Sequence, residues 1–190
     1  MRILFTTIPA MGHFHPLVPL AKAAREAGHD VAFASSRSIH PQIEASGFTA
    51  FSIDDSSAEV DRTSVVERVL QLPVGTRSLL ASIEVFISMS AKALPNLLEL
   101  CKRWQPDLIV REEYEFSGAV AAEVLGLPHA AVQVTYSSNW QTSLGQEFAN
   151  VAASHLDKVR AIGGLPSDPN LEMLYRHLFL SFDPPSLLDP

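Results

Sequence analysis

The chain opens with an apolar, β-rich run that stops abruptly in a short loop and is followed at once by an amphipathic run. The strand-like run covers residues 2–8, the loop contains Gly12 and His13, and helical periodicity begins near Pro16. This order predicts a strand, a tight turn and a helix, which is the repeating unit of open α/β sheets. Ligands of such sheets bind at the carboxyl edge of the strands, where Gly12 and His13 are expected to lie.

The same alternation of strand-like and helix-like segments continues along the chain. Pro95 is expected to kink the longest helix, because proline removes a backbone donor and clashes with the preceding turn. Short connections and apolar strands predict a Rossmann-like α/β fold, with a mostly parallel sheet of six or seven strands and helices on both faces. Strands are expected at residues 2–8, 30–35, 48–53, 107–110, 129–135 and 178–182, and helices at 16–27, 39–45, 60–70, 78–103, 117–125 and 141–162.

Composition limits the partners and the setting of the protein. Of the 190 residues, 47% are hydrophobic and 18% are charged, which suggests apolar surface reserved for a ligand or for another domain. The net charge of −7 and the lack of a basic cluster argue against nucleic acid as a partner. A single cysteine, Cys101, the lack of a recognisable secretory signal and the lack of an apolar run of bilayer length predict a cytoplasmic protein without a membrane span.

Glycine-rich phosphate-binding motifs are missing from the sequence. Neither Gly-x-Gly-x-x-Gly nor Gly-x-x-x-x-Gly-Lys-Ser/Thr occurs, so we expect no nucleotide site and no cofactor in these residues. The Gly-x-Ser-x-Gly motif is missing too, which disfavours a stand-alone hydrolase.

Two histidines, His13 and His15, lie in the first loop. They have no cysteine or carboxylate at metal-ligand spacing, so the pair does not support a zinc site. One interpretation is that His13 acts as a general base on a bound hydroxyl group, because the unperturbed pKa of a histidine lies near neutral pH. The other is that both histidines bind loop backbone or cap the helix that begins at Pro16. Spacing alone leaves both open.

An acidic run at residues 111–116, Arg-Glu-Glu-Tyr-Glu-Phe, follows the fourth expected strand and therefore lies at the same sheet edge as His13. Glu112 is the candidate to orient the imidazole of His13 and to stabilise its protonated form, as the aspartate of a hydrolase triad does. Alternatively, the three glutamates only precede the helix at Ser117 and complement the positive end of its dipole. Spacing alone favours this second interpretation.

Large apolar side chains gather at this sheet edge and are candidates to line a site for an apolar small molecule. Most residues of these kinds belong to ordinary core, so packing is the competing explanation for each of them. Tyr136 and Trp140 stand apart, because they lie in a polar loop after the fifth strand. The set is Phe14, Phe86, Met89, Tyr114, Phe116, Tyr136 and Trp140.

Two segments together resemble the amino-terminal half of a GT-B glycosyltransferase of the family-1 type, which glycosylates natural products such as macrolides and aromatic polyketides. Residues 12–17, Gly-His-Phe-His-Pro-Leu, with 27–31, Ala-Gly-His-Asp-Val, look like the opening motif of that family. Residues 106–112, Pro-Asp-Leu-Ile-Val-Arg-Glu, followed by 121–122, Ala-Ala, and 126–128, Gly-Leu-Pro, form the second match. The ordered pair of motifs is considerably more specific than the opening motif by itself.

The resemblance implies roles for single residues. His13 falls on the histidine that deprotonates the acceptor hydroxyl, and Glu112 falls on the supporting acid, which is often aspartate in the family. Gly12 and the apolar set above, Phe116 aside, would contact a lipophilic acceptor. The family's amino-terminal domain binds the acceptor and its carboxyl-terminal domain binds the nucleotide sugar. Residues 1–190 would therefore form the acceptor-binding domain of an inverting enzyme, without the donor domain and inactive alone.

A non-catalytic module built on the same half-fold is the alternative. Such a module would hold a lipophilic ligand or a partner enzyme against the same apolar side chains. It would be indifferent to the loss of His13 or Glu112, whereas the enzyme would not.

Overall fold

The computed structural model describes residues 1–54, 74–134 and 143–182 of the chain, and side chains over 1–54, 84–134 and 152–182. Within these residues, six strands form one sheet in the order β3-β2-β1-β4-β5-β6, and every neighbouring pair is parallel. This confirms the Rossmann-like α/β class. The strands are β1 (Arg2–Thr6), β2 (Asp30–Ser35), β3 (Thr49–Ser52), β4 (Leu108–Glu112), β5 (His129–Val132) and β6 (Leu178–Leu180).

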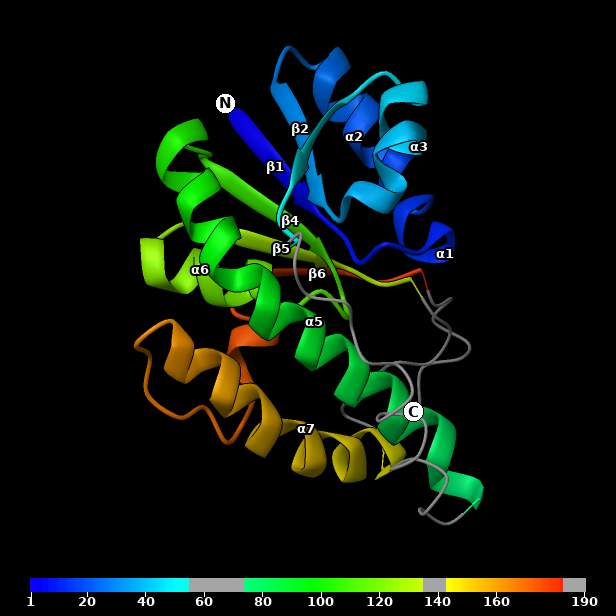
Figure 1. Ribbon diagram of the computed structural model, residues 1–190, viewed down its shortest axis with the longest axis vertical. Helices are drawn as coiled ribbons and strands as arrows, with labels where there is room; N and C mark the ends of the chain where they lie inside the picture. Colours follow the sequence, from blue (N-terminus) through cyan, green and yellow to red (C-terminus); the bar gives the residue numbers. More distant parts are fainter. Residues whose placement is uncertain (55–73, 135–142, 183–190) are drawn as a thin grey trace.

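Helices cover both faces of the sheet (Figure 1). The first helical layer holds α1 (Met11–Phe14), α2 (Leu17–Glu26), the 3₁₀ turn η1 (Arg37–Ile39) and α3 (His40–Ala45). The second layer holds α5 (Val74–Trp104), α6 (Ser117–Leu125), α7 (Ser143–Ile162) and the 3₁₀ turn η2 (Glu172–Leu174). In this second layer α5 lies against both α6 and α7. None of the helices in the described ranges is long and apolar enough to cross a bilayer.

Most elements fall where the sequence places them, and the clearest differences lie in two places. The tight turn expected after the first strand contains a single helical turn, α1, which begins at Met11. The longest helix, α5, begins at Val74 instead of near residue 78 and contains Pro95 in its interior, as expected. The helix expected at 60–70 lies outside the described residues.

Alternation along the strands separates two apolar cores. In β1, Ile3 and Phe5 pack with the layer of α1, α2 and α3, whereas Leu4 packs with the layer of α5, α6 and α7. Successive side chains of a strand point to opposite faces, so a strand covered by helices on both sides must be apolar throughout. The described sheet is therefore buried on both faces, and its carboxyl edge is where polar side chains can meet a ligand.

The start of α6 is fixed by a buried carboxylate and a glycine. The two carboxylate oxygens of Glu115 accept the backbone N–H groups of Ser117 and Gly118 at 2.9 Å each, and the hydroxyl of Thr6 also donates to this carboxylate. These bonds satisfy helix N–H groups that have no partner within the helix. A Cβ at Gly118 would lie 2.6 Å from Oγ1 of Thr6 and 2.7 Å from Oε2 of Glu115, so only glycine fits there.

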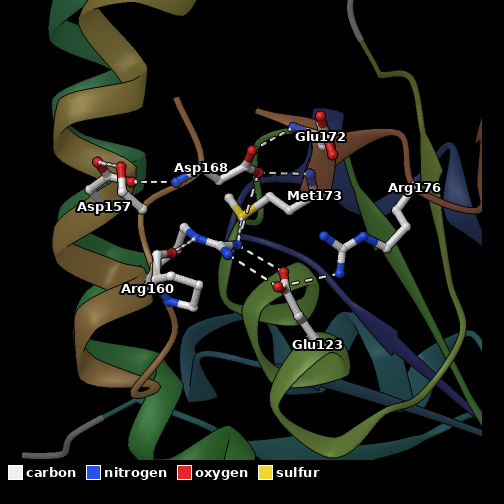
Figure 2. A network of polar contacts seen from close by, with 9 residues as sticks. Glu123, Asp157, Arg160, Asp168, Glu172, Met173 and Arg176 are labelled. Atoms are coloured by element: carbon white, nitrogen blue, oxygen red, sulfur yellow. Dashed lines mark hydrogen bonds and ion pairs between the residues drawn. The ribbon is translucent and has the colours of Figure 1, made fainter. Parts of the chain in front are cut away.

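A separate polar network joins the carboxyl ends of α6 and α7 to η2 (Figure 2). Arg160 of α7 binds both carboxylate oxygens of Glu123 of α6, at 2.8 and 3.1 Å, and donates from Nε to the carbonyl of Pro166 at 2.7 Å. Asp168 accepts the backbone N–H groups of Glu172 and Met173 at 3.0 and 2.9 Å. This network lies away from the sheet edge that carries His13 and serves the packing of the second helical layer.

Replacing Gly118 with alanine should lower the free energy of unfolding by about 1–3 kcal/mol, because the added methyl group overlaps Thr6 and Glu115. The measurement is urea unfolding followed by circular dichroism. Gly12→Ala is the matched control, since a Cβ at Gly12 meets nothing within 4 Å, and it should change the same quantity by less than about 0.5 kcal/mol. If the Gly118→Ala variant were as stable as the parent, the inference that Thr6 and Glu115 leave no room for a Cβ at residue 118 would be wrong.

Candidate active site

The pairing of β1 with β4 brings His13 and Glu112 to the same place. Thr6, the last residue of β1, is paired with Arg111 of β4, and Glu112 is the next residue and the last of that strand. His13 follows seven residues after Thr6, in the single turn of α1. Both side chains therefore lie at the carboxyl edge of neighbouring central strands, which is the edge where open α/β sheets bind ligands.

The two side chains are in direct contact. Nδ1 of His13 lies 3.1 Å from Oε2 of Glu112, and the exposed fractions of the two side chains are 15% and 0%. Nδ1 itself is buried and its N–H is not aligned with the oxygen, so the contact has ion-pair distance without full hydrogen-bond geometry. Hydrogen bonds of active-site side chains are often long or misaligned before substrate binds, so this geometry is compatible with a working pair. The exposed part of the ring lies away from Nδ1.

Burial dominates the electrostatics of Glu112. It raises the pKa of the carboxyl group above the ordinary range, while the contact with His13 and the backbone N–H of Tyr114 oppose that rise. The Tyr114 N–H donates to Oε2 at 2.8 Å, whereas Oε1 is buried without a hydrogen-bond partner among the described residues. A buried carboxylate with an unused oxygen is costly to maintain, which is typical of a functional site.

Two aromatic rings flank the imidazole. The ring centroid of His13 lies 5.5 Å from that of Phe86 and 5.9 Å from that of Tyr114, both edge to face, and the two aromatic rings are 5.3 Å apart. Phe86 comes from α5 and Tyr114 from the segment after β4. The imidazole thus has a carboxylate on Nδ1 and apolar walls beside it, an arrangement that lowers the access of water.

The structure separates the remaining apolar candidates. Phe14 is fully buried and packs on Phe33 in the core of the first helical layer, so the packing explanation is favoured for it. Phe116 is fully buried in the other core, and Met89 of α5 is half-buried. Tyr136 and Trp140 lie outside the described residues.

Gly12 lies in α1 and is exposed, and its backbone does not require glycine, since its φ is not positive and its Cβ direction is open. His15 is also exposed, next to the buried Phe14. The structure therefore distinguishes the two histidines, since within the described ranges His13 and not His15 contacts a carboxylate. Sequence spacing contains no signal for this difference, because it arises from the one-turn helix.

The three glutamates of the acidic run turn out to do three different things, and all are buried. Glu112 faces His13, Glu113 accepts the backbone N–H of Val134 at 2.9 Å, and Glu115 caps α6. Glu115 thus contacts the amino-terminal end of α6, as the dipole interpretation expects, and Glu112 contacts the imidazole, while its role toward His13 stays a prediction. Arg111, to which the sequence assigns no role, is also buried and binds the backbone carbonyls of this run. Among the described residues, no group of three or more His, Cys, Asp or Glu side chains is placed to hold a metal ion.

The fold and this edge site define a class: a Rossmann-like domain with a His–Glu pair at the carboxyl ends of its central strands. The family model of the erythromycin biosynthesis protein CIII-like amino-terminal domain matches residues 22–169. The chain belongs to this family.

Curated relatives agree with this family. The aclacinomycin-T 2-deoxy-L-fucose transferase of Streptomyces galilaeus is 33% identical over 157 residues, which cover 68% of this chain and 36% of the relative. The L-demethylnoviosyl transferase of Streptomyces niveus is 34% identical over 130 residues, which cover 67% of this chain and 33% of the relative. The chain thus spans about a third of the length of these natural-product glycosyltransferases.

A solved structure agrees as well. The glycosyltransferase SsfS6 of Streptomyces sp. SF2575 aligns with a TM-score of 0.75 and 26% identity, over 100% of this chain and 52% of the SsfS6 chain. The same protein complexed with thymidine diphosphate aligns with a TM-score of 0.74 over 98% of this chain and 50% of its own. The six-stranded domain therefore matches the amino-terminal half of a GT-B glycosyltransferase.

The raised pKa of Glu112 predicts a pH-dependent effect of Glu112→Gln on stability. When pH rises through the ordinary carboxyl range, the unfolded chain ionises first, so the folded parent loses stability relative to the neutral glutamine variant. The difference in free energy of unfolding between variant and parent should therefore grow in favour of the variant as pH rises above the ordinary carboxyl range. Urea unfolding at several pH values measures it.

Glu123→Gln provides a control of opposite sign, because the hydrogen bond from Arg160 lowers the pKa of Glu123. For that pair of proteins the parent should gain stability over the variant as pH rises through the carboxyl range. If the two variants changed with the same sign, the assignment of a desolvated carboxylate at Glu112 would be wrong.

Proposed function

We propose that residues 1–190 form the acceptor-binding domain of an inverting glycosyltransferase, which moves a sugar from a nucleotide-sugar donor to a hydroxyl group of a lipophilic small molecule. The donor would bind to a carboxyl-terminal domain that these residues do not include. The observation that carries the proposal is the 3.1 Å contact between His13 and the buried Glu112 at the ligand-binding edge of the sheet. The names of the curated relatives, all sugar transferases, support the reaction class.

The geometry supports a direct displacement with His13 as general base. With its Nδ1–H turned to Glu112, the neutral imidazole keeps the lone pair of Nε2 for the proton of the acceptor hydroxyl. The hydroxyl oxygen attacks the anomeric carbon, the bond from that carbon to the diphosphate breaks, and the diphosphate leaves with the electron pair. Glu112 stabilises the imidazolium that forms, as the carboxylate of a triad does.

The side chains beside His13 support a position for the acceptor, and a related structure supports the class of the donor. Phe86 and Tyr114 beside His13 would contact the apolar body of the acceptor, and Met89 lies on the same helix as Phe86. Tyr136 and Trp140 remain predictions as acceptor contacts. Thymidine diphosphate in the related SsfS6 structure supports a nucleotide-sugar donor, and a cytoplasmic setting remains our expectation for a chain with one buried thiol.

A non-catalytic module that holds a lipophilic ligand or partner enzyme is the second candidate. The apolar rings beside the imidazole would serve it equally well. The unused, desolvated oxygen of Glu112 favours the enzyme, because a binding module gains nothing from maintaining a buried charge beside an imidazole.

Removing the imidazole should abolish most of the transfer. In protein that includes the donor-binding half, His13→Ala should reduce kcat by about 100-fold or more, because a general base contributes about that factor. His15→Ala, an exposed histidine two residues away, is the matched control and should retain the parent rate. Transfer is followed by chromatography of the acceptor and its glycoside. If His13→Ala transferred sugar at the parent rate while binding acceptor normally, the module would be the better description.

Neutralising the supporting acid should have a smaller effect of the same kind. Glu112→Gln should lower kcat more than it raises KM, because the carboxylate acts on the imidazolium that forms only during the reaction. Glu113→Gln is the control, since Glu113 is equally buried one residue away and binds the Val134 N–H instead. Steady-state kinetics separate kcat from KM, and an equal loss in both variants would mean that burial in this segment, not contact with His13, matters.

A further inference from the structure

Arg111 is a fully buried cation whose polar contacts are with backbone. Its exposed fraction is 1%, and Nη1 donates to the carbonyls of Glu112, Glu113 and Glu115 at 3.2, 2.8 and 3.4 Å. Nη2 donates to the carbonyl of Leu174 in η2 at 3.0 Å. One guanidinium therefore binds three carbonyls at and after the end of β4 and also a carbonyl of the second helical layer.

These carbonyls need a partner because the chain leaves the sheet here. After Glu112 the strand ends, and the following residues turn back within buried surroundings before α6 begins at Ser117. A buried carbonyl without a donor is costly. The guanidinium therefore stabilises the curled conformation of this segment, in which all three carbonyls accept hydrogen bonds from it. In that conformation the Tyr114 N–H reaches Oε2 of Glu112, which is the oxygen that contacts His13.

Stability alone does not account for a charge at this position. Burial lowers the pKa of Arg111 against the nearby glutamates, and its Nε has no hydrogen-bond partner among the described residues. Replacing a buried charge with an apolar side chain of similar volume is often neutral or stabilising. What an apolar side chain cannot supply is a fork of donors that shapes the segment 112–115.

We propose that Arg111 is a positioning residue for the His13–Glu112 pair: it curls the segment after β4 so that the Glu112 carboxylate and the Tyr114 ring meet the imidazole. The proposal deepens the proposed function and rests on it for its catalytic meaning. The far end of the segment is held independently, because the hydroxyl of Thr6 and the start of α6 both bind Glu115. Removing Arg111 should therefore release the part nearest to Glu112.

The test is to determine which tautomer His13 adopts in the Arg111→Lys variant. Lysine keeps the positive charge but lacks the planar fork of N–H donors of the guanidinium. In the parent at alkaline pH, the ¹⁵N shifts of the ring should show the proton on Nδ1, facing Glu112, since the partner of one ring nitrogen sets the tautomer. In the variant they should show the tautomer mixture of the exposed His15, which is the internal reference. Amide exchange of Tyr114 should also become about tenfold faster or more, as its bond to the carboxylate is lost.

Arg160→Lys is the matched control, because Arg160 is an equally buried arginine whose fork binds Glu123 and the Pro166 carbonyl away from His13 (Figure 2). It should leave the His13 tautomer and Tyr114 exchange at parent values. If Arg111→Lys does not fold, Arg111→Met, which removes the buried charge, carries the same test with the same expected changes.

The positioning role would be overturned if a folded Arg111 variant kept His13 in the Nδ1–H tautomer and exchanged the Tyr114 amide at the parent rate. It would also be overturned if Arg160→Lys changed the tautomer and the exchange rate as much as the Arg111 variant does. Sugar transfer enters neither measurement. A His13→Ala enzyme with full activity would refute the proposed function while leaving the tautomer result intact. An unchanged tautomer in Arg111→Lys, together with loss of transfer in His13→Ala, would refute only the role of Arg111.

Discussion

The parallel pairing of β1 with β4 is the constraint on which the rest of this structure depends. These strands are separated by a hundred residues, yet their register sets Thr6 opposite Arg111, so that the chain segments after them emerge side by side. His13 lies in the segment after β1, and Glu112 is the last residue of β4. Because helices cover both faces of the sheet, this edge is also where polar groups can meet a ligand. Fold and site are thus consequences of one strand pairing.

Around that edge the protein buries several charged groups and satisfies them mainly with backbone. Glu113 and Glu115 accept backbone N–H groups, and Arg111 donates to backbone carbonyls. Each of these bonds fixes the direction of the chain between β4 and α6. Two buried atoms have no such partner in the described part of the chain, Oε1 of Glu112 and Nε of Arg111. The free energy that the neighbouring bonds contribute offsets the cost of keeping that carboxylate beside an imidazole.

Periodicity and turn residues predict the elements of this fold well. For β2 and α6, the bounds expected from the sequence are the bounds that the structure shows. The edge that carries His13 and Glu112 is equally predictable, since it follows from strand order. The one-turn helix α1 is not, because four residues contain too little periodicity to reveal it. Nor is the division of roles among Glu112, Glu113 and Glu115, which depends on the rotation of the chain after β4. Phe14 looks like its aromatic neighbours in sequence, and only the turn of α1 directs it into the core.

The placement of Phe14 has a consequence for how this site changes during evolution. The helix α1 has no side-chain cap, and its only buried residue is Phe14, which contacts Phe33 at a centroid distance of 5.3 Å. The one-turn helix that carries the neighbouring imidazole therefore rests on an apolar contact beneath it. Substitutions that alter the volume under α1 would shift the imidazole without touching any polar group. Such remote repacking is a gradual way for the position of this imidazole to change during evolution.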